Sequence, residues 1–142
     1  MKINMLKILT CIVAAAAALT VSCGGGQKPA AGTGDDVLLT DSVLMHGLTD
    51  TVRFGRLGEG EIAVRRLTMR NESSRPVVFV GEDVSCGCVS LEYDRRPVMP
   101  GGTVVVAVTF DSRGEYGWQM KRVLLRPGDA APLKLYVEAE VE

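Results

Sequence analysis

From residue 37 onward, apolar and polar residues alternate in short runs, and turn-forming residues interrupt these runs about every ten positions. The clearest run spans residues 133–141, where leucine, valine and alanine alternate with lysine, tyrosine and glutamate. Alternation with a period of two is typical of a strand with one buried face. Because no run keeps a helical period, the pattern predicts an all-β domain.

About seven short strands are expected from this pattern. The predicted strands span residues 51–55, 61–71, 77–80, 84–91, 103–110, 118–125 and 133–141. In the second of these, Ala63, Leu67 and Met69 share one face, on which Arg65 is the exception. Short strands of this kind, separated by turns, predict an immunoglobulin-like antiparallel β-sandwich.

The first 22 residues have the pattern of a signal peptide for export. Lys2 and Lys7 are followed by an apolar stretch that extends to Val21, and no acidic residue occurs in this region. At about 1.5 Å per residue, the stretch would form a helix about 21 Å long, whereas the hydrocarbon layer of a membrane is about 30 Å thick. Residues 1–22 are therefore predicted to be a removable signal rather than a permanent membrane span.

Cys23 follows the small residue Ser22 and precedes three glycines. This order is typical of a bacterial lipoprotein, which is cut before a cysteine whose sulfur then carries lipid. We expect a lipidated Cys23 and a flexible linker over residues 23–36, followed by one domain over residues 37–142. The expected location is the bacterial cell envelope, with the domain facing the periplasm or the cell surface. An ordinary secretory signal, in which Cys23 is incidental, is the alternative.

The charge of the chain bears on its partners. The formal net charge is −1, and basic residues are not gathered into one long cluster. Proteins that bind nucleic acid normally carry a clustered basic face. The sequence therefore predicts no nucleic-acid partner, and it predicts contact with a membrane only through the lipid anchor.

Several short motifs in the domain resemble those of a known family. In chain order they are Phe54-Gly55, residues 67–71, residues 76–80, Ser85-Cys86-Gly87-Cys88, residues 97–102, Phe110-Asp111 and Gly117. Together they resemble the bacterial domain-of-unknown-function family numbered 1573, over about residues 51–141. The resemblance implies an exported, often lipid-anchored protein with a domain similar to the immunoglobulin-like Hydin and major-sperm-protein group. It implies no established biochemical activity.

Cys86 and Cys88 are the two cysteines expected in the folded domain, where their sulfurs could form a disulfide or bind a metal. In an extended strand their Cα atoms would lie about 6.6 Å apart, at the edge of the roughly 4.4–6.8 Å range of disulfides. Gly87 allows the chain to bend, and a bridge formed here is expected to be strained and easily reduced. Three interpretations remain open: a local structural disulfide, a redox-active pair, and a Cu(I) site made by two thiolates.

Methionines extend the copper interpretation, because thioether sulfur is also a soft ligand. The candidates are Met45, Met69, Met99 and Met120, of which Met69 is expected to be a core residue. Zinc is less favoured, because a closed structural zinc site takes four Cys or His ligands and the domain offers two cysteines and His46.

The sequence contains no recognisable acid–base carboxylate pair and no nucleophile motif, which predicts a protein that is not an enzyme. Trp118 begins a predicted strand and is expected at the edge of the core. The favoured function is therefore a membrane-anchored lipoprotein whose immunoglobulin-like module holds an envelope protein or a glycan. The alternative is a thiol-redox or Cu(I)-handling protein that uses Cys86 and Cys88.

Overall fold

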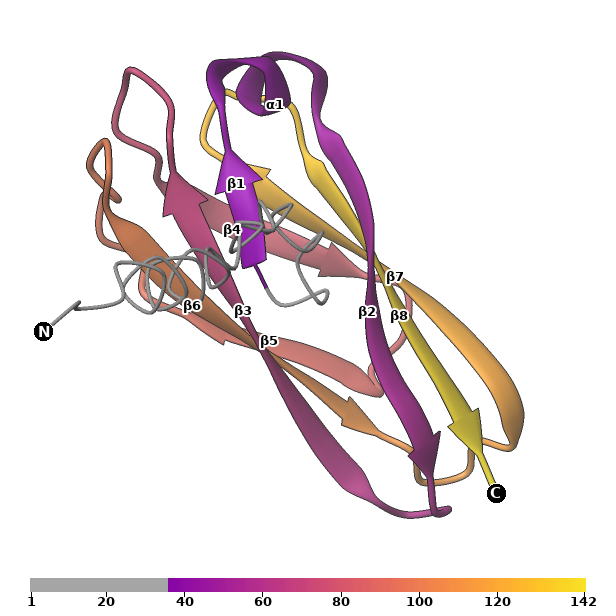
Figure 1. Ribbon diagram of the computed structural model, residues 1–142. Coiled ribbons are helices and arrows are strands. Elements are labelled where there is room, and N and C mark those ends of the chain that lie inside the picture. The colour runs from indigo at the N-terminus through magenta and orange to yellow at the C-terminus, as the bar shows by residue number, and fades with distance from the viewer. Residues whose placement is uncertain (1–35) are drawn as a thin grey trace, which may run out of the picture. The chain divides into compact units, whose positions relative to one another are not determined.

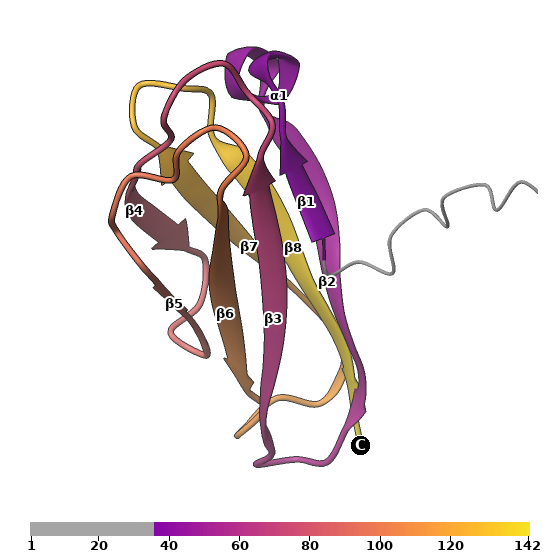
Figure 2. The same ribbon diagram turned by 60° about the vertical axis from the view of Figure 1, so that its left-hand side comes forward.

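The computed structural model describes residues 36–142, and the β-rich pattern of this region folds into two facing sheets (Figures 1 and 2). One sheet has the strand order β1-β3-β6-β5 and the other has the order β2-β8-β7-β4. The strands are β1 (Asp36–Leu39), β2 (Leu48–Leu57), β3 (Ile62–Asn71), β4 (Phe79–Val84), β5 (Val89–Tyr93), β6 (Thr103–Asp111), β7 (Gly117–Pro127) and β8 (Leu133–Val141).

The predicted β-sandwich is confirmed, with two differences in its detail. Residues 36–142 contain eight strands rather than about seven, because β1 was not predicted. The sheets are mixed rather than purely antiparallel, since β1 pairs with β3 and β2 pairs with β8 in parallel. Hydrophobic alternation reports which face of a strand is buried, but it carries no information about strand direction.

The core lies between the sheets and is built from alternate residues of the strands. In β8, Leu133, Leu135 and Val137 are all buried, as the alternation predicted. The rings of Phe54 and Phe110 lie with their centroids 6.0 Å apart. Because β2 and β6 belong to different sheets, this aromatic contact joins the two layers.

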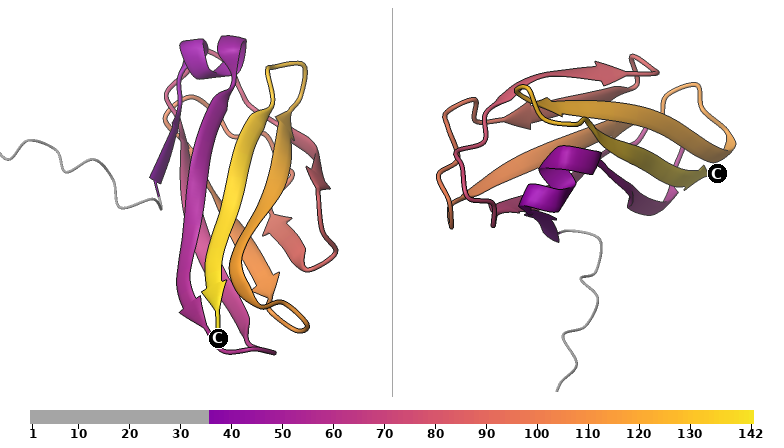
Figure 3. Two further views of the ribbon diagram at one scale, coloured as in Figure 1. Left: turned by 90° about the vertical axis from the view of Figure 1, so that its right-hand side faces the viewer. Right: turned by 90° about the horizontal axis from the view of Figure 1, so that it is seen from above.

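A short helix, α1 (Asp41–His46), links β1 to β2 at one end of the sandwich (Figure 3). Thr40 caps its first turn by accepting a hydrogen bond from the Val43 backbone N–H at 3.2 Å. Gly47 ends the helix with a φ of 82°, a conformation that favours glycine. The expectation of an all-β domain missed α1, because six residues are too few to establish a helical period.

The predicted strand 84–91 is wrong. The chain leaves β4 at Val84, turns through residues 85–88, and enters β5 at Val89. Since β4 and β5 belong to different sheets, this turn carries the chain across the edge of the sandwich. The short apolar pattern continues through the turn, so that alternation alone could not show the interruption.

In β3, Arg65 is an exception to the buried, apolar face of the strand, as predicted. Leu67 and Met69 are buried, whereas Arg65 is exposed although it pairs with the buried Val108. The reason is the short length of β1, which pairs only with residues 68–71 of β3. Within residues 36–142, the earlier part of β3 is an edge strand, and the long Arg65 side chain reaches solvent around that edge.

The predicted signal peptide over residues 1–22, and Cys23 with the linker as far as residue 35, lie outside the described residues. Asp36, the last predicted linker residue, begins β1. Among residues 36–142, no helix has the length and apolar character needed to span a bilayer.

Candidate functional site

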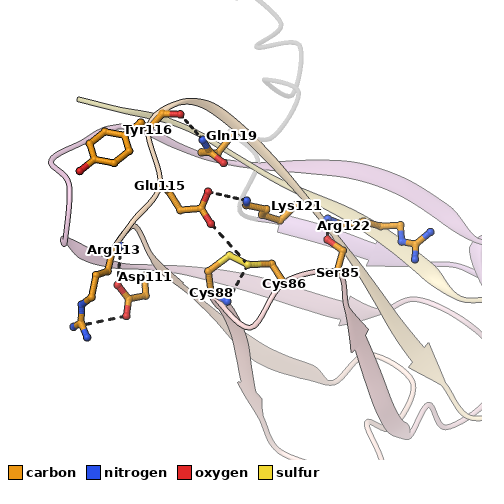
Figure 4. Close-up of polar contacts among 10 residues, drawn as sticks. All are labelled: Ser85, Cys86, Cys88, Asp111, Arg113, Glu115, Tyr116, Gln119, Lys121 and Arg122. Atoms are coloured by element: carbon orange, nitrogen blue, oxygen red, sulfur yellow. Dashed lines mark hydrogen bonds and ion pairs between the residues drawn. A yellow bond between two sulfur atoms is a disulfide. The ribbon is translucent and has the colours of Figure 1, made fainter.

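The turn that contains the two cysteines is held by hydrogen bonds to both sheets. On the side of β7, Ser85 exchanges two hydrogen bonds with the backbone of Arg122, each 2.9 Å long. On the side of β6, the Asp111 N–H donates to the Cys88 carbonyl at 2.9 Å. The turn is therefore fixed between the sheets rather than projecting freely from them (Figure 4).

Cys86 and Cys88 are joined by a disulfide, and their Cα atoms lie 5.1 Å apart. This separation falls within the range of about 4.4–6.8 Å that disulfides adopt. The backbone turns at Gly87 instead of running extended, as the glycine was expected to allow. In addition, the Cys88 backbone N–H donates to Cys86 Sγ at 3.1 Å.

Two charged side chains lie beside the disulfide (Figure 4). Glu115 Oε1 is 4.0 Å from Cys86 Sγ, and Glu115 Oε2 accepts a hydrogen bond from Lys121 Nζ at 2.9 Å. The Lys121 and Glu115 side chains are only 18% and 22% exposed, so this ion pair is largely withdrawn from water. Such a pair interacts more strongly than one on an open surface.

Glu115 and Lys121 were missed by the sequence reasoning. Glu115 lies in the β6–β7 connection, 29 residues after Cys86, and nothing in its local sequence marks its position. Lys121 gave a signal that could have been used. It shares the inward register of β7 with Val123 and Leu125, so a lysine at this position requires a buried partner.

The other predicted ligands are placed away from this cluster. Met69 is fully buried in β3, as expected for a core residue, and His46 ends α1. Met45 is exposed on α1, and Met99 is exposed in the connection between β5 and β6. Met120 directly precedes Lys121 and points to the opposite face of β7.

A second polar contact joins β4 to β5 across the same edge of the sandwich. The Tyr93 hydroxyl donates to Glu82 Oε2, and the Arg95 guanidinium lies 5.1 Å from the Tyr93 ring centre. Burial, followed by the hydrogen bond to the Glu82 carboxylate, raises the pKa of Tyr93 to about 12. This contact and the cysteine turn therefore reinforce the same crossing between the sheets.

The expectation for Trp118 is wrong, because its side chain is 59% exposed instead of lying at the edge of the core. The register of β7 explains the difference. Gly117 and Gln119 stand opposite the buried Val141 and Ala139, which leaves Trp118 on the outer face. Met120 and Tyr116, which directly precedes β7, are also exposed, and we call Tyr116, Trp118 and Met120 the exposed β7 segment.

These observations define a class of protein: a two-sheet β-sandwich domain with a Cys-X-Cys disulfide turn at one edge. The chain belongs to the family described as "Protein of unknown function (DUF1573)", which matches residues 45–141. The resemblance drawn from the motifs is thereby confirmed. No curated protein matches the chain.

Three solved structures are similar to parts of this chain. A protein of unknown function from Porphyromonas gingivalis W83 is 19% identical with a TM-score of 0.57, over 63% of this chain and 43% of that protein. The secreted serine protease VesC from Vibrio cholerae is 13% identical with a TM-score of 0.46, over 61% of this chain and 21% of VesC. A Bacteroides ovatus GH5 xyloglucanase is 10% identical with a TM-score of 0.44, over 65% of this chain and 17% of the enzyme. The chain thus spans less than half the length of each protein, and the Porphyromonas likeness supports the fold alone.

Proposed function

We propose that this protein is a membrane-anchored lipoprotein of the bacterial cell envelope. Its immunoglobulin-like domain has no enzymatic activity and holds another envelope component, either a protein or a glycan. The sequence around Cys23 supports the anchor, since an apolar stretch too short to span a bilayer ends at a cysteine that is followed by glycines. The family of the chain supplies no activity that competes with this proposal.

The observation that carries the binding role is the exposed β7 segment. Tyr116 is 70% exposed and Trp118 is 59% exposed. Aromatic side chains of this size are enriched in binding surfaces because they bury a large apolar area and also offer a polar group. Glu140 and Glu138 stand beside Trp118 and Met120 on β8, where their carboxylates can accept hydrogen bonds from hydroxyl or amide donors.

The anchor is tested by Cys23→Ser, followed by separation of membrane and soluble fractions. We expect the wild-type protein in the membrane fraction and the variant in the soluble fraction, because the variant lacks the sulfur that carries the lipid. Cys11→Ser changes a cysteine inside the predicted signal and should leave the protein in the membrane fraction. Equal membrane retention of Cys23→Ser and wild type would contradict the anchor.

The binding role is tested by retention of the protein on isolated envelope protein and envelope glycan preparations. Trp118→Ala should weaken retention on one of them by about ten-fold, the effect typical of losing an aromatic contact residue. Met45→Ala removes an apolar side chain that is even more exposed, on α1, and serves as the control. Unchanged retention of Trp118→Ala would contradict a role for the exposed β7 segment.

A second candidate function is thiol-redox or Cu(I) handling at Cys86 and Cys88. One observation favours it: the two cysteines are joined by a disulfide, beside which lie the Glu115 carboxylate and the Lys121 ammonium. The copper form of this candidate requires the reduced protein to bind one equivalent of Cu(I), and Cys86→Ser with Cys88→Ser to abolish that binding. The binding-module proposal expects no such stoichiometry.

A further inference from the structure

The side chains around the disulfide turn have the composition of a metal site. Cys86 Sγ, Cys88 Sγ and a Glu115 carboxylate oxygen all lie within 4.8 Å of one another, and all three residues are half-buried. We infer that, after reduction of the disulfide, Cys86, Cys88 and Glu115 form a binding site for a divalent cation of the zinc class. The inference rests on the reducible cysteine pair of the second candidate function, and it is independent of the lipid anchor.

The ligand types favour a zinc-class ion over Cu(I). Cu(I) prefers soft sulfur ligands, whereas the third ligand beside the two cysteines is a hard carboxylate oxygen. Zinc, by contrast, accepts thiolate sulfur and carboxylate oxygen together. Glu115 is the ligand that the sequence could not supply, and it changes the expected metal from copper to zinc.

The geometry needs only small changes to accept the ion. With Zn–S bonds of about 2.3 Å and Zn–O bonds of about 2.0–2.2 Å, tetrahedral ligands lie about 3.5–3.8 Å apart. Glu115 Oε1 is already 4.0 Å from Cys86 Sγ. Reduction lets the two sulfurs separate by side-chain rotation. Apart from Gly87 and its two chain neighbours, no described heavy atom lies within 4 Å of the position of a Cβ at Gly87, so the turn has room to adjust. Water would fill the fourth position.

The surrounding groups stabilise the metal-bound form. The Cys88 N–H, which donates to Cys86 Sγ, would stabilise a thiolate at that sulfur. Lys121 binds the other carboxylate oxygen and thereby keeps Oε1 turned toward the sulfurs. Two thiolates and one carboxylate carry three negative charges, which a divalent cation and the Lys121 ammonium balance.

The redox step is a two-electron reduction by a dithiol. The dithiol breaks the Cys86–Cys88 bond, supplies two electrons and two protons, and is itself oxidised to a disulfide. Metal binding then forms two metal–sulfur bonds and releases the two thiol protons to solvent. Oxidation removes both thiolate ligands, so metal binding and the disulfide exclude each other, and bound metal protects the pair from oxidation.

The test uses the full chain with Cys11→Ser and Cys23→Ser, so that Cys86 and Cys88 are the only cysteines. After anaerobic reduction with a phosphine, alkylation of one portion counts the free thiols, and Zn²⁺ is titrated into a separate, unalkylated portion against a chromophoric chelator. We expect two thiols and one bound Zn²⁺ per chain, with Glu115→Gln weakening binding at least ten-fold. Asp111→Asn, a nearby carboxylate outside the cluster, should bind as tightly as the parent.

Cobalt gives a second readout, since Co²⁺ held by both cysteines produces a thiolate charge-transfer absorption that the Cys86→Ser, Cys88→Ser variant lacks. Circular dichroism confirms that each variant keeps the β fold. Failure of two thiols to appear in the folded protein would overturn both the redox candidate and the metal site. Two thiols without zinc binding, or equal binding by Glu115→Gln, would overturn the metal site alone.

Discussion

A single buried amide, that of Asn71, fixes the turn between β3 and β4. Its Nδ2 donates to the carbonyls of Arg75 and Val98 at 2.8 Å each, and its Oδ1 accepts from the N–H and hydroxyl of Ser73. Asn71 is fully buried, so no water molecule can replace its amide as the hydrogen-bond partner of these backbone and hydroxyl groups. Asparagine side chains in turns commonly bond the backbone two residues on, so the short-range partner Ser73 was predictable. The bond to Val98, 27 residues away, was not.

Asn71→Ala is expected to lower the free energy of unfolding by about 3 kcal/mol, because it leaves several buried groups without partners. Chemical denaturation measures the change. Glu72→Ala, at an exposed neighbouring residue that pairs with Arg70, should cost less than about 1 kcal/mol. A loss for Asn71→Ala no larger than that of Glu72→Ala would contradict this role of the amide.

Tyr93 is the residue whose ionisation should respond to the β4–β5 contact. Its pKa is raised from 10.0 to about 12, so between these values the folded protein holds a proton that the unfolded chain has lost. The stabilisation is therefore complete below about pH 10 and is lost as the pH rises toward about 12. Alkaline ultraviolet titration should show a late phenolate transition that Tyr93→Phe lacks. The contact would be contradicted if wild type and Tyr93→Phe titrated identically above pH 11 and differed only by one tyrosine that ionises at lower pH.

At the scale of the elements, the exposed edge of β3 carries the charged side chain of Arg65. Arg65 occupies a position of β3 that would normally face the core. It lies in the part of β3 that does not pair with β1, so this part forms an edge of the sheet. Charged residues in such positions oppose pairing of edge strands between molecules. The alternation in the sequence showed that Arg65 is an exception. It could not show that Arg65 lies at a sheet edge, because the neighbours of a strand are set by contacts between residues distant in sequence.

Arg65→Val is expected to shift the protein toward dimers or larger species in sedimentation velocity, with a change in unfolding free energy of about 1 kcal/mol or less. Arg122→Val is the matched control, because Arg122 is exposed on β7, which pairs with β8 on one side and with Ser85 and β4 on the other. Equal self-association of the two variants would show that edge pairing is not the cause.

The elements also show where sequence reasoning stops. Strands β6, β7 and β8 were predicted closely because each has a long alternating pattern, which is a local property. The division of β4 and β5 between two sheets depends on which partners they find, and the turn at Cys86 and Cys88 follows from that division. Glu115 and Lys121 joined the candidate site for the same reason, because β6 and β7 bring them to this turn.

At the scale of the whole molecule, the β-sandwich of residues 36–142 follows an anchor that we propose from the first 23 residues. Parallel pairing of β1 and β2 with their neighbours was not predictable, because it requires the chain to cross between the sheets through α1. The family and the fold were predictable from spaced motifs. The anchor chemistry remains a prediction, and it decides where the exposed β7 segment and the cysteine turn act.

The most direct test of this account is the intact mass of the native protein extracted from membranes. The account predicts a polypeptide that begins at Cys23 and carries additional mass from acyl chains on that residue. A native protein that still begins at Met1 and carries no acyl mass would contradict it.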